Sequence, residues 1–221
     1  MSADDDFYSK YYAVTTNQGA TGILHKIAHR QLESNLHEKS FSKILELGAN
    51  DGEHFKFVKI DFDEYVMTDI SYKQEKERFD FRNRKVAKQY ADVQNLPFKA
   101  NSFQRVITSC VLHHVANPFQ ALEEIRRVCQ PGGTVSIHLS ADPSILYRAL
   151  WRVGSERKLK KLNPGLDYRF MHAREHVGNC FSIEKILKTV FSEDRILRRR
   201  FPFPWSWNLN LHSTYQIKVL K

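Results

Sequence analysis

Short apolar segments alternate with helical segments between residues 43 and 140, and this alternation constrains the fold more than any other feature of the chain. Strands separated by single helices form right-handed βαβ units, so they lie parallel in one sheet. Strands that helices cover on both faces are apolar along their length, as the later strands are here. The sequence therefore predicts an α/β fold. The expected strands are 43–47, 65–71, 85–92, 103–112 and 133–140, and the expected helices are 53–60, 72–79 and 118–130.

The two ends of the chain extend this plan. The last segment alternates polar and apolar residues, which is typical of a strand lying antiparallel to its neighbours. The pattern is irregular at 141–180. The remaining expected elements are helices at 4–15, 20–38 and 182–191 and strands at 195–202 and 209–220.

The loop after the first strand, Glu46-Leu47-Gly48-Ala49-Asn50-Asp51-Gly52, indicates a ligand that approaches the backbone closely. Asp69 ends the next strand, 21 residues after Gly48. An acid at about 20 residues beyond such a loop commonly bonds a ribose hydroxyl. These features alone fit either a dinucleotide or S-adenosylmethionine.

Charge separates these two ligands. A dinucleotide loop has glycine where this chain has Asn50 and Glu53, and its pyrophosphate lies at the helix N-terminus. Asp51 and Glu53 would repel a pyrophosphate there. S-adenosylmethionine has no phosphate and carries a sulfonium and an ammonium, so an acidic loop favours it. A dehydrogenase is therefore the weaker enzyme hypothesis, and a strand–turn–helix without a ligand is the structural alternative.

Four further motifs follow the loop in a fixed order, and together they carry a resemblance to a known family. The chain resembles the class I S-adenosylmethionine-dependent methyltransferases, in the branch that includes quinone-type and many small-molecule methyltransferases. The resemblance covers residues 43–140. The motifs are Ala91-Asp92-Val93-Gln94-Asn95-Leu96-Pro97-Phe98, Asn101-Ser102-Phe103-Gln104-Arg105-Val106-Ile107, Val111-Leu112-His113-His114-Val115 and Pro131-Gly132-Gly133.

The resemblance implies where S-adenosylmethionine binds. Gly48, Asn50 and Gly52 would line its methionine part, with Glu46 beneath the loop. Asn50 departs from the family, which usually has glycine there, but asparagine tolerates left-handed backbone conformations. The residues implied for the rest of the cofactor are Asp69 for the ribose, Asp92 and Val93 for the adenine, and the Ser109 backbone near the methionine amine.

The resemblance also implies a Rossmann-like fold: a seven-stranded, mostly parallel sheet with helices on both faces and the last strand antiparallel. We expect one domain over 1–221. Its parts would be an N-terminal helical lid at 1–40, with Tyr8, Tyr11 or Tyr12 facing the cofactor, a cofactor-binding core at 43–140, an acceptor-site insertion at 141–180 and closing elements at 181–221.

Two histidines are the candidate catalytic residues. His113 follows the strand that ends near Ser109, and His138 lies near the end of the next strand. Neighbouring parallel strands end at the same cleft, and histidine can accept the proton of a hydroxyl acceptor near neutral pH. We expect His113 or His138 to act as general base or to orient the acceptor, and His114 to pack against the following helix.

Charge is distributed unevenly along the chain. Residues 1–110 hold equal numbers of basic and acidic residues, so the whole net charge of +9 lies in residues 111–221. The basic run Arg157-Lys158-Leu159-Lys160-Lys161 follows apolar residues, which fits a solvated helix face, a phosphate-bearing acceptor or an anionic membrane surface. Nucleic acid is a weaker hypothesis because aromatic residues do not interleave with the basic ones in a recognised module.

The expected function is methyl transfer to oxygen or nitrogen of a small molecule, a saccharide or phosphate-linked compound. The alternatives are a lipid head group, RNA, or a role as a non-catalytic methyltransferase-fold subunit that activates a partner. The aromatic segment Phe201-Pro202-Phe203-Pro204-Trp205-Ser206-Trp207 fits core packing or the lining of an acceptor pocket.

Cysteine usage and the lack of a long apolar run indicate a cytoplasmic protein. Three cysteines have no metal-ligand spacing. His172 and His176 fit the H-x-x-E-H pattern of some zinc proteases, but no third ligand is evident. We therefore expect no metal site.

Overall fold

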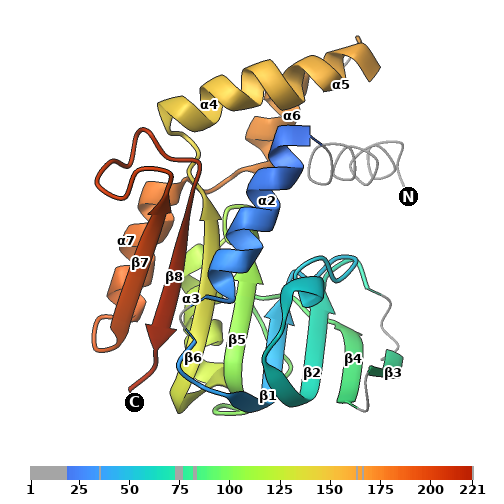
Figure 1. Ribbon diagram of the computed structural model, residues 1–221, viewed down its shortest axis with the longest axis vertical. Coiled ribbons are helices and arrows are strands. Elements are labelled where there is room, and N and C mark those ends of the chain that lie inside the picture. Colours follow the sequence, from blue (N-terminus) through green and yellow to red (C-terminus); the bar gives the residue numbers. More distant parts are fainter. Residues whose placement is uncertain are drawn as a thin grey trace.

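An eight-stranded sheet forms the centre of the computed structural model, which describes residues 19–34, 36–72, 77–81, 84–162, 164–165 and 167–220 (Figure 1). Its order is β3-β4-β2-β1-β5-β6-β8-β7. The five strands from β4 to β6 are mutually parallel, whereas β8 lies antiparallel to both its neighbours. The strands are β1 (Ser40–Leu47), β2 (Asp61–Asp69), β3 (Glu77–Phe81), β4 (Arg84–Tyr90), β5 (Phe103–Ser109), β6 (Cys129–Ser140), β7 (Arg195–Phe201) and β8 (His212–Lys218).

This architecture confirms the predicted fold class: a Rossmann-like, mostly parallel sheet whose last strand is antiparallel. The eighth strand, β3, is an addition at the edge, and it corrects the helix predicted at 72–79. Residues 77–79 belong to β3, which pairs antiparallel with β4 and brings Glu77 opposite Lys88. Opposite charges across a strand pair stabilise it. The helical pattern of the local sequence could not indicate this pairing.

The helix predicted at 53–60 is also wrong. Only a 3₁₀ turn forms there, at Phe55–Phe57, and the chain becomes extended at Val58. Aromatic and β-branched residues have low helix propensity. Phe55 instead packs edge-on against Tyr65, with ring centroids 4.9 Å apart, and helps to cover one face of the sheet.

Helices cover both faces of the sheet. Successive residues of a strand point to opposite faces, and accordingly Leu45 and Val106 lie in one apolar core while Ile44 and Ile107 lie in the other. The first core contains residues of α3 and α7, and the second contains Leu32 of α2. The helices are α2 (Gly19–Leu32), α3 (Pro118–Val128), α4 (Ile145–Trp151), α5 (Arg157–Leu162), α6 (Tyr168–Glu175) and α7 (Cys180–Val190), with a π-helical turn, η2, at Arg152–Glu156.

The parts predicted at the two ends have different outcomes. The helix predicted at 20–38 exists as α2 but ends at Leu32. The helix predicted at 4–15, with Tyr8, Tyr11 and Tyr12, lies outside the described residues. The irregular region 141–180 forms α4, η2, α5 and α6, which lie beyond the edge toward which the parallel strands point (Figure 1). Its role as acceptor-site insertion stays a prediction.

A buried ion pair joins α2 to the centre of the sheet. Arg105, on β5, is fully buried. Its guanidinium donates to Glu33 Oε1 at 2.7 Å and to Oε2 at 3.2 Å, and also to the Leu32 carbonyl at 3.1 Å. The same carboxylate lies 3.0 Å from Nε2 of His54, whose Nδ1 is 3.0 Å from Nδ1 of His29. The positive charge of Arg105 at the centre of the sheet is thus paired with the Glu33 carboxylate at the end of α2.

Both ends of this network have shifted pKa values. Burial alone would raise the pKa of Glu33, but hydrogen bonds from His54 and Arg105 lower it to about 2. Burial, and then the neighbouring His54, lowers the pKa of His29 to about 3. In the folded chain Glu33 is therefore ionised and His29 neutral over the ordinary pH range.

We expect Arg105→Met to lower the free energy of unfolding by about 3–5 kcal/mol, because it leaves the Glu33 carboxylate buried without its main partner. Urea unfolding measures this. The matched control is Lys43→Met, which removes an ion pair to Glu64 that is about one third exposed on each side and should cost less than about 1 kcal/mol. Adding Glu33→Leu to Arg105→Met should recover part of the loss. Equal losses in the two single variants would contradict this account.

Stability should also fall in acid. The unfolded chain protonates His29 near pH 6.5 and Glu33 near pH 4.5, whereas the folded chain resists both down to about pH 3 and pH 2. Stability is therefore full above these unfolded values and is lost as the pH falls, by about 1.4 kcal/mol per pH unit for each group that only the unfolded chain protonates. Urea unfolding between pH 7.5 and 5.0 tests this. His29→Gln should reduce the slope by the share of one group, since other buried histidines also have lowered pKa values. An unchanged slope would exclude a contribution from His29.

Candidate active site

The carboxyl ends of β1, β2, β4, β5 and β6 lie at one edge of the sheet, where ligands bind in open α/β folds (Figure 1). The residues predicted to bind the cofactor come from these ends. The loop 48–52 follows β1, Asp69 ends β2, Asp92 follows β4 by two residues, and Ser109 ends β5. The structure therefore brings to one edge all the elements that the sequence pointed to.

The loop after β1 has three residues in the left-handed region: Gly48 (φ +65°), Asn50 (φ +43°) and Gly52 (φ +73°). Asparagine thus adopts the conformation expected of it in place of the family's glycine. Gly48 also lies very close to the loop after β5, since a Cβ atom on Gly48 would lie 2.2 Å from a methyl group of Val111. Glycine is required at this position by both its dihedral angle and its contact.

Asp69 fixes the shape of this loop. Its Oδ2 accepts a hydrogen bond of 2.9 Å from the Asn50 backbone N–H. Its Oδ1 accepts from the N–H of Ser71 at 2.9 Å and from its hydroxyl at 2.7 Å. The Tyr72 hydroxyl donates to the Asn50 carbonyl. Because each carboxylate oxygen can accept two bonds, Asp69 keeps capacity for a ribose hydroxyl.

Glu46 lies one residue before the end of β1, and its character differs from that of a free acid. It is buried and accepts a hydrogen bond of 2.6 Å from the Tyr65 hydroxyl. Burial raises the pKa of Glu46 despite the opposing effects of His54 and Tyr65. Tyr65 is therefore part of the support of the loop, and nothing in the local sequence indicated it.

Asp92 and Val93 follow β4. Asp92 Oδ1 accepts from the Gln94 backbone N–H at 2.8 Å, and the Gln94 side-chain Oε1 accepts from the Asn117 N–H at 2.8 Å. Val93 is buried in the apolar core beside α3. This turn thus holds the Asp92 carboxylate in place, and its adenine contact stays a prediction.

Ser109 and His138 face each other across β5 and β6. The Ser109 hydroxyl lies 2.9 Å from His138 Nδ1, and Cys110 Sγ lies 3.3 Å from the same nitrogen. Burial lowers the pKa of His138 well below its ordinary value, and His212 and His25 lower it further. The largest effects on this pKa all lower it, so a proton on His138 would be poorly stabilised.

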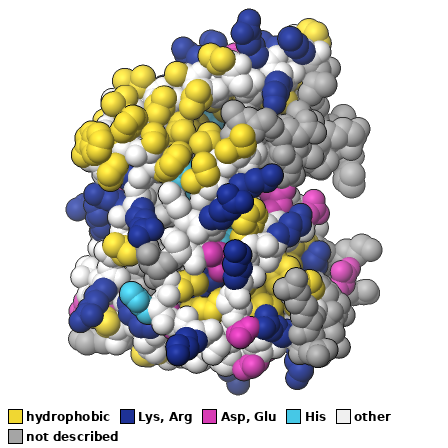
Figure 2. All heavy atoms as spheres, viewed as in Figure 1, with side chains coloured by type: hydrophobic (Ala, Val, Ile, Leu, Met, Phe, Trp, Pro, Cys, Tyr) yellow, Lys and Arg dark blue, Asp and Glu magenta, His cyan; other side chains and the backbone are white. Residues whose placement is uncertain are grey.

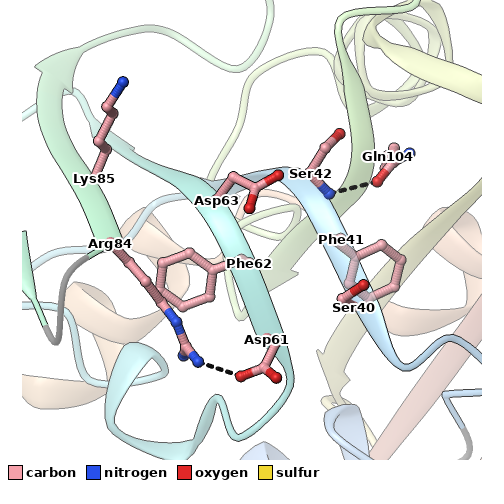
Figure 3. Close-up of a pocket in the computed structure, with 9 residues that line it drawn as sticks. All are labelled: Ser40, Phe41, Ser42, Asp61, Phe62, Asp63, Arg84, Lys85 and Gln104. Atoms are coloured by element: carbon pink, nitrogen blue, oxygen red, sulfur yellow. Dashed lines mark hydrogen bonds and ion pairs between the residues drawn. The ribbon is translucent and has the colours of Figure 1, made fainter.

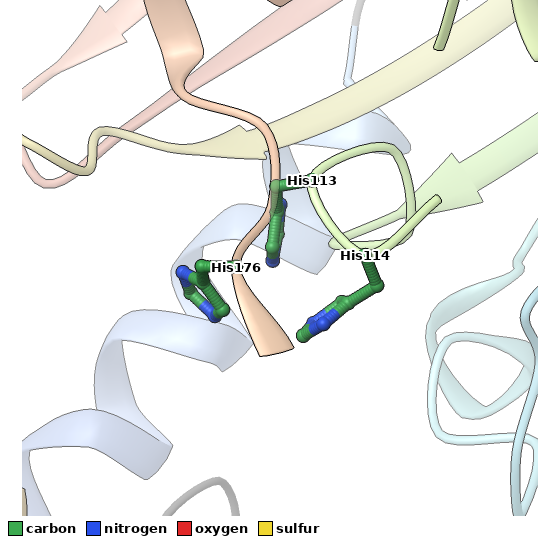
Figure 4. Close-up of side chains that lie close together, drawn as sticks. All are labelled: His113, His114 and His176. Carbon is green, nitrogen blue, oxygen red and sulfur yellow. The ribbon is translucent and has the colours of Figure 1, made fainter. Parts of the chain in front are cut away.

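His113 lies in a second group of histidines. Figure 4 shows its ring beside those of His114 and His176, with centroids 4.3 and 4.4 Å away. His113 is buried, and its Nδ1 lacks a hydrogen-bond partner among the described residues. Burial lowers the pKa of His113 well below its ordinary value, His114 and His176 lower it further, and Asp142 opposes them. The sequence marked the histidines separately but could not show that they meet.

His114 was expected to pack against the following helix, but it also contacts α6. Its Nδ1 lies 2.9 Å from the Glu175 carbonyl oxygen at the end of α6. Burial, followed by His176, lowers the pKa of His114 to about 4. The loop after β5 is thus hydrogen-bonded to the 141–180 region. The Gly178 N–H also donates a hydrogen bond of 3.1 Å to the His113 carbonyl.

A depression in the surface lies at the opposite edge of the sheet (Figure 3). It is formed where β1, β2 and β4 begin, and it includes the ion pair between Arg84 and Asp61 and the 2.5 Å bond from the Ser42 N–H to Gln104 Oε1. None of the predicted site residues lines it. It therefore takes no part in the candidate active site.

The fold and the acidic glycine loop at the carboxyl edge are those expected of the class I S-adenosylmethionine-dependent methyltransferases. Residues 45–137 match the protein family described as "Methyltransferase domain". The chain accordingly carries a methyltransferase domain of this class, and S-adenosylmethionine is its cofactor. No helix of the described residues is long and apolar enough to cross a membrane.

Curated relatives match parts of the chain. A demethylmenaquinone methyltransferase from Staphylococcus haemolyticus is 28% identical over 132 residues, covering 55% of this chain and 53% of that protein. One from Paenarthrobacter aurescens is 43% identical over 61 residues, covering 28% of this chain and 23% of that protein. The chain thus spans from 3% to 53% of the length of the curated relatives it matches.

A solved structure shares the fold over nearly the whole chain. It is a chain from the complex between the Haloferax volcanii Trm112 methyltransferase activator and a methyltransferase. The TM-score is 0.61 at 12% identity, with 95% of this chain and 96% of that chain covered. At this identity the likeness concerns the fold alone.

We expect Gly48→Ala to weaken S-adenosylhomocysteine binding by at least about tenfold, because the added methyl group meets Val111 and the positive φ becomes strained. Calorimetric titration measures the affinity. Val111→Ala in the same chain should restore part of it by removing the contact but not the strain. As a control, Asn50→Gly should bind within about threefold of the original chain, since glycine adopts the same φ freely. Normal binding by Gly48→Ala would contradict the loop's role.

Proposed function

We propose that this chain transfers the methyl group of S-adenosylmethionine to an oxygen or nitrogen of a small acceptor, a saccharide or phosphate-linked compound held near an anionic lipid surface. The proposal rests on one observation. The acidic glycine loop and Asp69 lie at the carboxyl edge of the sheet, together with the histidines of the 141–180 region.

The cofactor takes the positions that the resemblance implies. Gly48, Asn50 and Gly52 line the methionine part, and the fixed carboxylate of Asp69 accepts from the ribose. The remaining contacts are Asp92 and Val93 with the adenine, the Ser109 backbone near the methionine amine, and Glu46 in support of the loop. The spare acceptor capacity of Asp69 and the close passage of Gly48 support this arrangement.

The reaction breaks the bond between the methyl carbon and the sulfonium sulfur, whose electron pair stays on S-adenosylhomocysteine. The acceptor atom forms the new bond to carbon, and a hydroxyl acceptor releases its proton to a base. Because the sulfonium is already a good leaving group, most of the rate enhancement comes from holding the acceptor in line.

His113 is the preferred acceptor-orienting or proton-accepting residue. It is buried beside the cofactor edge, its Nδ1 is unpartnered among the described residues, and Asp142 opposes the lowering of its pKa by burial. His138 is the second candidate. Its contact with Ser109 better supports a positioning role, in which it holds the end of β5.

A methyl-transfer assay with labelled cofactor and pooled extracts, followed by mass analysis of the product, tests the function. If His113 is the base, His113→Ala should lower kcat by about 10²–10⁴ while S-adenosylhomocysteine affinity stays nearly unchanged. His138→Ala should lower kcat less. Tighter binding of NAD than of S-adenosylhomocysteine would refute the class of reaction, and kcat within about threefold in both variants would exclude both histidines as the base.

The surface around α4 supports the lipid part of the proposal. Figure 2 shows hydrophobic side chains gathered where Figure 1 has α4 and the loop between β7 and β8, with basic side chains beside them. The loop is tied to α4 by a 3.3 Å bond from the Leu146 N–H to the Asn208 carbonyl. Trp205 is 77% exposed and Ile145 63%. Exposed tryptophan beside basic residues suits the interface of an anionic membrane.

The chain should therefore sediment with phosphatidylglycerol vesicles more than with phosphatidylcholine vesicles, and less at high salt. Trp205→Ser should reduce this binding, and so should charge reversal at Arg157, Lys158, Lys160 and Lys161. Phe119→Ser and Lys99→Glu are the matched controls, since both residues are exposed but lie away from α4. Equal loss in the controls, or no binding at all, would leave the basic segment as a solvated helix face.

A protein partner is the alternative to a lipid surface. The exposed apolar side chains could instead contact a protein, and the Haloferax volcanii neighbour of this fold was solved with a methyltransferase activator. A non-catalytic, partner-activating subunit that has lost its cofactor contacts would bind neither S-adenosylmethionine nor S-adenosylhomocysteine measurably. Micromolar cofactor binding therefore separates the two functions before the acceptor is known.

A further inference from the structure

Three side chains from two distant segments converge on one point at the carboxyl edge of the sheet, and we call them the Asp–His triad. Asp142 follows β6, while His172 lies on α6 and His176 directly follows it. Asp142 Oδ2 lies 3.1 Å from His172 Nε2 and 3.4 Å from His176 Nδ1. The two imidazoles are four residues apart and so share one side of the helix, with ring centroids separated by 4.0 Å.

These distances match those between the ligands of a small metal ion. One ligand atom from each of the three residues lies within 4.8 Å of the other two. Tetrahedral zinc with bonds of about 2.0–2.2 Å separates its ligand atoms by about 3.3–3.6 Å. The nitrogen-to-oxygen distances in the triad are 3.1 Å, just below that range, and 3.4 Å, within it. Little movement would be needed to accept the ion.

The groups around the triad leave the required lone pairs available. Arg148 approaches the other carboxylate oxygen, Oδ1, at 3.6 Å, so it does not occupy Oδ2. Trp151 stacks on His172 with centroids 4.8 Å apart and shields one side of it. The triad side chains are 13–18% exposed, which allows an ion to enter from solvent.

A second, independent observation points to a missing ligand beside the triad. His113 is only 4% exposed, its Nδ1 has no partner among the described residues, and its ring lies 4.4 Å from that of His176. Unpartnered buried nitrogens are costly and uncommon. A water molecule or acceptor oxygen held by an ion at the triad would supply the missing partner.

We propose that Asp142, His172 and His176 bind one divalent first-row transition-metal ion, of which Zn²⁺ is the representative. Two imidazoles and a carboxylate suit such an ion better than Mg²⁺ or Ca²⁺, which prefer oxygen ligands throughout. Three protein ligands leave at least one position open, as in catalytic rather than structural zinc sites. That this position receives an acceptor oxygen rests on the proposed function, whereas binding of the ion does not.

This proposal replaces the expectation of no metal site. The sequence showed His172 and His176 at ligand spacing but no third ligand, because Asp142 lies 30 residues before His172 and joins it only in the fold. His113, His114 and His176 form another group with ligand spacing, and it shares His176 with the triad. We assign the ion to the triad because His114 Nδ1 is already bound to the Glu175 carbonyl and His113 is the more deeply buried.

The test uses the full chain, freed of metal with a chelator and titrated with Zn²⁺ by calorimetry and with Co²⁺ by visible absorption. We expect one equivalent to bind with micromolar or tighter affinity. Asp142→Asn and His172→Asn should each weaken binding by more than about 100-fold, since loss of outer-sphere partners alone costs about 10–100-fold. His114→Asn and the exposed His37→Asn should stay within about threefold of the original chain.

Each other outcome overturns the assignment. The proposal fails if the original chain binds no ion, or if His114→Asn loses the ion while His172→Asn keeps it. It also fails if Co²⁺ shows a thiolate charge-transfer band, which would indicate a cysteine site. S-adenosylhomocysteine binding is measured on the same samples. It shows that each variant is folded, and its absence in the original chain would refute the methyltransferase function without affecting the metal result.

Discussion

The ion pair between Arg105 and Glu33 is the interaction on which the packing of α2 against the sheet depends. An arginine on a central strand is tolerated only if its charge and its donors are matched, and the end of α2 supplies both the carboxylate and the Leu32 carbonyl. That requirement fixes α2 across β6 and β8, where His212 bonds Gln31 at 2.9 Å. It also brings His25 of α2 to 6.4 Å from His138, ring centroid to ring centroid, and thus shapes the surroundings of the strand ends.

The sequence predicted those features that follow from local pattern and from the geometry of parallel strands. The glycine loop, Asp69 and Asp92 follow different strands, and parallel strands must end at one edge, so their convergence needed no knowledge of side-chain packing. The sequence could not reveal contacts made across the fold. Arg105 and Glu33 are 72 residues apart, and their ion pair leaves no periodic signal in either segment.

The two wrong helices have the same kind of cause. Residues 53–60 have aromatic side chains at a spacing that a helix also allows, but Phe55 gains more by packing on Tyr65 than the segment gains from helical hydrogen bonds. Residues 77–79 form a strand because β4 offers an unpaired edge. In both places a tertiary partner overrode a weak local preference, and neither partner is adjacent in sequence.

The two histidine groups at the cofactor edge differ in the charge that accompanies them, and this difference assigns them different chemistry. His25, His29 and His212 all lower the pKa of His138, so its contact with Ser109 is its main contribution. Near His113, Asp142 binds two imidazoles through one oxygen and favours positive charge. A metal ion that polarises an acceptor would therefore have its charge compensated by Asp142, on the side of the 141–180 region. The exposed apolar side chains of α4, Ile145 and Leu150, belong to that same region.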